Sequence, residues 1–179
     1  MSDQGITVGG IPIPSREPWF LATVAVHVLA GLVAVVAGAV AMLSPKRAGR
    51  HPRAGTLYFR ALIVISVTMG ALVVARWPDN NHLGALGTLA LGSAWLGRKA
   101  RRQRWGQWMP IHVTLMGFSY ILMMTAFYVD NGPHLPLWRA LPTIAFWTLP
   151  AIIGLPLIVL ALTRRRPDLN DAGGAPHRP

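Results

Sequence analysis

The stretch KRAGRHPRAGTLYFR, residues 46–60, lies between two apolar stretches and contains five of the seventeen Lys and Arg residues in the chain. Two further basic blocks lie at 98–104 and 164–178, and the three blocks together contain fourteen of the Lys and Arg residues. The other three, Arg16, Arg76 and Arg139, each lie at the opposite end of an apolar stretch. Lys and Arg resist translocation and stay in cytoplasmic loops, so this alternation is typical of a protein that crosses a membrane several times.

The composition excludes an ordinary soluble domain. Of 179 residues, 53% are hydrophobic and 13% are charged, whereas soluble domains average about 25% charged residues. A net charge of +11 would indicate nucleic-acid binding in a soluble chain. In cytoplasmic loops the same charge faces anionic lipid headgroups, so we expect the lipid bilayer, and not nucleic acid, as partner. The chain has no Cys, which excludes disulfides, iron–sulfur clusters and thiolate zinc sites.

Five apolar stretches near the length of a membrane-spanning helix predict an all-α, polytopic membrane helix bundle. The expected spans are 19–43, 52–76, 82–96, 109–129 and 142–162. The third span is short, at about 15 residues, and without it the bundle would have four spans. The basic blocks place the N-terminus outside and the C-terminus in the cytoplasm. The Ala-, Gly- and Arg-rich composition suggests the inner (cytoplasmic) membrane of a bacterium.

This topology divides the chain into three parts. An external polar tail is expected at 1–18, a single five-helix transmembrane domain at 19–163, and a cytoplasmic tail, basic and then polar, at 164–179.

Polar residues form stripes along the second and fourth spans at helical spacing. The stripe on the second span contains His51, Gly55, Tyr58, Leu62, Ser66, Met69 and Arg76. The stripe on the fourth span contains His112, Met116, Ser119, Met123, Ala126 and Asp130. Polar groups within a membrane usually face the bundle interior, so we expect the stripes to face each other and Arg76 to pair with Asp130. Alternatively, Ser66 and Ser119 bond to their own helices.

His27 lies on a face of the first span rich in small residues: Thr23, Gly31, Ala34, Gly38 and Ala41. One interpretation is close helix packing through the small side chains, with His27 hydrogen-bonded across the interface. The other is a flat cofactor that lies against this face.

Four histidines lie on four successive spans at alternating depths. His27 and His82 share an outer level, and His51 and His112 share an inner one, although His51 would lie about two turns deeper toward the cytosol. A b-type haem takes two axial histidines, so diagonal pairs of His27 with His82 and of His51 with His112 could bind two haems. This layout resembles transmembrane cytochromes that pass electrons between two b haems. The resemblance implies a haem-b electron-transfer protein with a membrane redox partner.

A second interpretation uses the outer end alone and resembles membrane hydrolases that bind zinc through three histidines, with Asp and Ser nearby. Its metal-binding residues would be His27, His82, Asp130 and His134. Catalytic zinc takes such ligands and keeps one position open. Gly132 and Pro133 interrupt the helix between Asp130 and His134, so these two side chains are not assured of sharing a face.

The segment HPRAGTLY at 51–58, with HVLAG at 27–31 and His112 at the start of a later span, resembles a bacterial membrane-protein family catalogued as domain of unknown function 2306. His51, Gly55 and Tyr58 follow its pattern of His, Gly and Tyr, with one extra residue between His and Gly. The likeness covers 19–166 and implies a small helical membrane protein without an assigned activity. A small transporter, or an accessory membrane subunit with no site of its own, is the third interpretation. A membrane redox partner or a second copy of this chain in a homo-oligomer is the expected protein partner, and whether the protein is an enzyme stays open.

Overall fold

A computed structural model describes residues 6–8, 11–13, 17–45, 49–75 and 80–164. Strands β1 (Ile6–Val8) and β2 (Ile11–Ile13) pair antiparallel before the first helix. The long helices follow, with a short 3-10 helix after the fourth: α1 (Pro18–Leu43), α2 (Arg50–Ala75), α3 (Asn81–Arg102), α4 (Trp108–Asn131), η1 (Gly132–His134) and α5 (Thr143–Thr163). The predicted all-α bundle is therefore observed.

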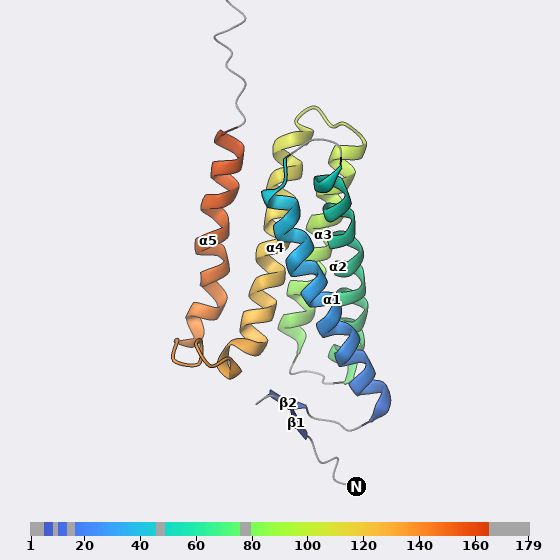
Figure 1. Ribbon diagram of the computed structural model, residues 1–179, viewed down its shortest axis with the longest axis vertical. Helices are drawn as coiled ribbons and strands as arrows, with labels where there is room; N and C mark the ends of the chain where they lie inside the picture. Colours follow the sequence, from blue (N-terminus) through green and yellow to red (C-terminus); the bar gives the residue numbers. More distant parts are fainter. Residues whose placement is uncertain (1–5, 9–10, 14–16, 46–48, 76–79, 165–179) are drawn as a thin grey trace, which may run out of the picture.

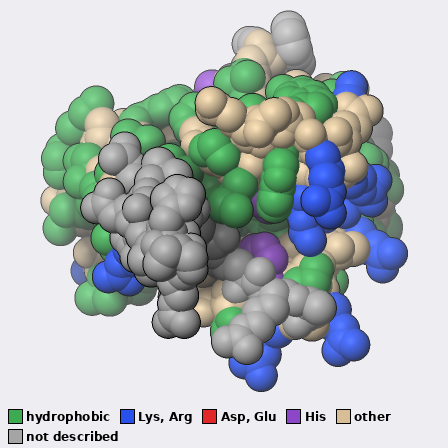
Figure 2. All heavy atoms as spheres, turned by 90° about the horizontal axis from the view of Figure 1, so that it is seen from above, with side chains coloured by type: hydrophobic (Ala, Val, Ile, Leu, Met, Phe, Trp, Pro, Cys, Tyr) green, Lys and Arg blue, Asp and Glu red, His purple; other side chains and the backbone are tan. Residues whose placement is uncertain are grey.

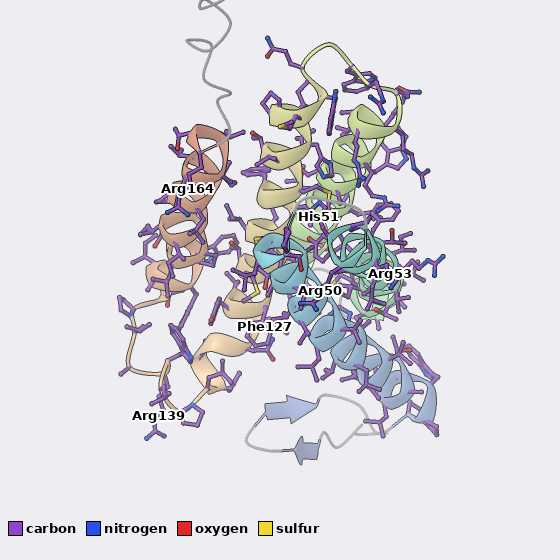
Figure 3. The ribbon with its side chains drawn as sticks, turned by 45° about the horizontal axis from the view of Figure 1, so that its top comes forward. Arg50, His51, Arg53, Phe127, Arg139 and Arg164 are labelled. Atoms are coloured by element: carbon purple, nitrogen blue, oxygen red, sulfur yellow. The ribbon has the colours of Figure 1, made fainter. Side chains whose placement is uncertain are left out.

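Helices α1 to α4 form a four-helix bundle, and α5 packs mainly against the outside of α4 (Figure 1). Successive helices run in opposite directions, so the α1–α2 and α3–α4 connections lie at one end of the bundle. We call this the basic end. Arg50 and Arg53 at the start of α2 and Arg164 after α5 lie there, whereas Arg139 lies at the opposite end, in the connection between η1 and α5 (Figure 3). The charge alternation in the sequence thus corresponds to an up-and-down arrangement of helices.

Among the residues that the structure describes, four helices are long and apolar enough to cross a membrane: α1, α2, α4 together with η1, and α5. They indicate a multi-pass membrane protein. Helix α3 is not among them, although it has 22 residues and packs between α2 and α4. It continues beyond the predicted end at Leu96 to Arg102, because Lys, Arg and Ala all favour helix. That α3 also crosses the membrane, as a further span, stays a prediction.

The outer surfaces of α1 and α5 fit a lipid environment. Leu32 and Val36 of α1, and Ile152 and Val159 of α5, are each about 60% exposed. Apolar surface on this scale is rare in soluble monomers, and contact with lipid chains explains it.

The core of the bundle contains many small residues. It is formed by Ala34, Ala37, Tyr58, Ala61, Leu62, Ile65, Ala90, Ala94 and Met123. Small side chains let the helix backbones approach closely. Gly38 shows how closely, because a methyl group there would overlap the ring of Tyr120 on α4. This part of the small-residue face of α1 therefore packs closely against Tyr120 of α4, as the packing interpretation expects.

Candidate functional site

A buried hydrogen bond joins α2 to α4 across the centre of the bundle. The hydroxyl oxygens of Tyr58 and Ser119 lie 2.8 Å apart, and these residues are only 2% and 0% exposed. The hydroxyl group of neighbouring Tyr120 donates to the carbonyl oxygen of Val35 on α1, at 3.1 Å. The prediction that the polar stripes of the second and fourth spans face each other is confirmed at this pair.

Two histidines at the basic end have matching environments. Nδ1 of His51 lies 2.8 Å from the carbonyl oxygen of Ala41, and Nδ1 of His112 lies 2.9 Å from that of Gly97. A carbonyl oxygen only accepts hydrogen bonds, so each Nδ1 must carry the proton. In the neutral ring the lone pair is then on Nε2.

Each of these bonds ties the beginning of one helix to the end of the helix before it. His51 is the second residue of α2 and bonds to the last turn of α1. His112 is in the second turn of α4 and bonds to α3 one turn before its end. We call these two hydrogen bonds the helix clasps. The hairpins α1–α2 and α3–α4 are therefore each closed by the same kind of hydrogen bond, at the same end of the bundle.

The two clasp histidines lie on diagonal helices, since α2 contacts α1 and α3, and α4 contacts α3. Each of the two histidines lies where a helix begins at this end, His51 in the first turn of α2 and His112 in the second turn of α4. His51 lies among the helix ends in the view of Figure 3. Both histidines of the predicted inner pair thus belong to the basic end, and their pairing stays a prediction.

The outer pair has a different arrangement. His27 lies 2.9 Å, through Nδ1, from the hydroxyl oxygen of Thr68 on α2, as the packing interpretation expects. Thr68 donates its own proton to carbonyl oxygens of α2, so its hydroxyl group accepts from His27. His82 is exposed, and its ring lies beside Trp147 of α5 with centroids 5.9 Å apart. The two rings contact different neighbours, and their pairing stays a prediction.

The residues of the zinc interpretation belong to four different elements: His27 to α1, His82 to α3, Asp130 to α4 and His134 to η1. His82, Asp130 and His134 are exposed. His134 lies in the 3-10 helix η1, so it does not continue the α-helical face of Asp130. In the part of the chain that the structure describes, no group of three or more His, Asp or Glu side chains could hold a metal ion. Arg76, the predicted partner of Asp130, lies outside the described residues.

Cationic side chains lie beside the histidines at the basic end. Arg98 donates to the carbonyl oxygen of Gly55 at 3.3 Å and lies 4.6 Å from the centre of the Phe59 ring. Figure 2, seen from this end, shows Lys and Arg side chains gathered on one side of a central histidine. The acidic residues that the structure describes, Glu17 and Asp130, belong to the opposite end. The basic end therefore attracts anionic groups.

Comparison with known proteins finds no matching family model, no matching curated protein and no matching solved structure. The resemblances to domain of unknown function 2306 and to two-haem cytochromes therefore rest on the sequence pattern alone.

Proposed function

We propose that this multi-pass membrane protein is a haem-b electron-transfer protein, with His51 and His112 as the axial ligands at its basic end. The observation that carries the proposal is the pair of helix clasps. Histidines that bind metal nearly always donate their other ring N–H to a carbonyl, carboxylate or water, which fixes the tautomer and the ring orientation. Both clasp histidines do so from diagonal helices.

The surroundings of this pair suit a haem in three respects. Arg98 and Arg101 both interact electrostatically with His112, and cations of this kind pair well with carboxylates such as the haem propionates. A methyl group on Gly55, one turn after His51, would meet no atom within 4 Å, so that side of α2 has open space. Below the pair, the Tyr58–Ser119 bond closes the core. Haem would supply one-electron transfer, while the chain ligates, orients and limits water.

The same proposal includes a second haem between His27 and His82, which fewer contacts support. Only His27 has a ring fixed by a neighbouring helix. The described residues contain no group of His, Asp and Glu side chains that could hold a metal ion, so the zinc hydrolase is not the function that we propose.

Orientation and location are part of the proposal. We place the basic end in the cytoplasm of a bacterial cell and the protein in its inner membrane. In this arrangement α3 crosses the membrane as well as α1, α2, α4 and α5, which gives five spans. The basic blocks support this orientation, since Lys and Arg are retained on the cytoplasmic side. There the cationic end would meet anionic lipid headgroups and a membrane redox partner.

The test compares two kinds of substitution at the clasp histidines. His112→Asn keeps an N–H donor near the position of Nδ1 but removes Nε2, so it should preserve the clasp and abolish haem binding. His112→Ala removes both groups. We expect both variants to lose haem absorbance, and the Asn variant to stay closer to wild-type thermal stability. The same comparison applies to His51→Asn.

The principal alternative is that the clasps only fasten the two helix hairpins, as in an accessory subunit without a cofactor. In that case His112→Asn would resemble the wild type in every respect. A His112→Asn variant with wild-type haem content would contradict the proposed ligation.

A further inference from the structure

A cavity of about 380 Å³ lies between α2 and α3, away from the basic end. Small-molecule sites in proteins typically have volumes of about 300–1,000 Å³. We infer that this cavity binds an uncharged, membrane-soluble molecule that bears a hydroxyl group. The residues that carry the inference are Ser66, Met69, Gly70, Asn81, Gly87 and Thr88. This site is separate from the histidine pair and does not depend on the proposed haem.

Two polar atoms in the cavity wall lack partners. The hydroxyl oxygen of Ser66 and the side-chain oxygen of Asn81 are buried and form no hydrogen bond in the described structure. Thr88, in the same wall, donates to the carbonyl oxygen of Gly84 at 2.9 Å. Leaving a buried polar atom unpaired is costly, and such atoms are uncommon in native proteins. Asn81 needs a donor, and a ligand hydroxyl group can donate to Asn81 and accept from Ser66.

Two glycines of this wall, Gly70 and Gly87, keep the cavity open, whereas a methyl group on Gly84 would lie 3.1 Å from Val73. A methyl group on Gly70 would meet nothing within 4 Å, and one on Gly87 would only reach Met69, at 3.9 Å. On α4, by contrast, a methyl group on Gly117 would overlap Ile158 of α5. Glycines usually draw membrane helices together, but Gly70 and Gly87 instead border unfilled volume. The α2–α3 contact is also less extensive than those of α1 with α2 and α3 with α4.

The lining decides the class of ligand. It contains no charged residue, and an ion in a membrane without a partner is costly, so the ligand is neutral. Gly70 and Thr88 are exposed, so the cavity opens on the helix surface, and a ligand can enter from the bilayer. A lipid acyl chain alone would leave Ser66 and Asn81 unpaired. Water would form these hydrogen bonds but would leave the apolar side chain of Met69 without an apolar partner.

The experiment uses photoreactive probes on the full chain in phosphatidylcholine nanodiscs. One probe is a trifluoromethyl-phenyldiazirine with a hydroxymethyl group, and its matched partner has an ethyl group at that position. After irradiation, mass spectrometry measures labelling of peptides that cover 66–88. We expect the hydroxyl probe to label these peptides more strongly than its partner. Ser66→Ala should reduce its labelling by roughly two- to tenfold, the effect of one neutral hydrogen bond.

Two further variants complete the test. Gly87→Leu fills the cavity without removing either polar group and should reduce labelling by both probes. Thr148→Val on α5 removes a hydroxyl group that bonds to its own helix and should change nothing. Equal labelling by the two probes, or labelling that neither Ser66→Ala nor Gly87→Leu reduces, would overturn the inference and leave water or lipid as the occupant. Since none of these readouts measures haem, the result is independent of the histidine proposal.

Discussion

The Tyr58–Ser119 hydrogen bond offers a quantitative test of the bundle, because it joins diagonal helices at full burial. Tyr58→Phe removes one hydroxyl group and leaves that of Ser119, which can rotate to a carbonyl of its own helix. We expect a loss of about 1 kcal/mol in the free energy of unfolding. In Ser119→Ala the buried hydroxyl group of Tyr58 has no such alternative acceptor. We expect a loss of about 2 kcal/mol in the free energy of unfolding.

The double variant, with both hydroxyl groups removed, should be less destabilised than the sum of the single variants. Coupling energies of polar pairs in membrane bundles average about 0.6 kcal/mol and reach about 1.7 kcal/mol, and the burial of this pair favours the upper half of that range. The assay is reversible unfolding in mixed dodecylmaltoside and dodecyl sulfate micelles, followed by circular dichroism. The control cycle combines Ser119→Ala with Tyr120→Phe, since Tyr120 bonds to Val35 instead. Coupling of zero for Tyr58 with Ser119, equal to the control, would refute the diagonal contact.

Further predictions concern packing, topology and lipid. Gly38→Leu should destabilise the bundle by about 1–3 kcal/mol through its collision with Tyr120. Gly31→Ala meets no atom within 4 Å and replaces a poor helix former with a good one, so in the same micelle assay it should be as stable as the wild type or more stable, by up to about 1 kcal/mol. Alkaline phosphatase fusions should be active after Asn81 and Gly132 and inactive after Arg50, Arg102 and Arg166, and activity after Arg102 would show that α3 does not cross the membrane. Neutralising Arg101, Arg102 and Arg104 together should reduce retention of the protein by anionic nanodiscs, and unchanged retention would mean that these residues only set topology.

Much of the fold could be predicted from hydropathy and charge. The apolar stretches gave α1, α2, α4 and α5 to within a few residues. The end of α3 was missed because hydropathy falls at Arg98, while the helix continues to Arg102 through residues that favour helix. Hydropathy measures affinity for lipid, and hydrogen bonding along the backbone does not stop at the lipid boundary.

The site was predictable only in part, for a related reason. Helical spacing placed Tyr58 opposite Ser119, because each lies on a polar stripe that must turn inward. It could not reveal the helix clasps, since their acceptors are backbone carbonyls and every residue offers one. Nor could it separate Gly38 from Gly70, because a glycine permits close packing or open space alike, and only the neighbouring helix decides which occurs.

Binding of haem by His51 and His112 can be measured directly through the visible absorption spectrum of the detergent-purified wild type, together with its haem content per chain. We expect a Soret band, sharp α-bands on reduction, and one haem per chain, or two if His27 and His82 also bind. A purified protein from haem-supplied cells that shows no Soret band would contradict the proposed ligation.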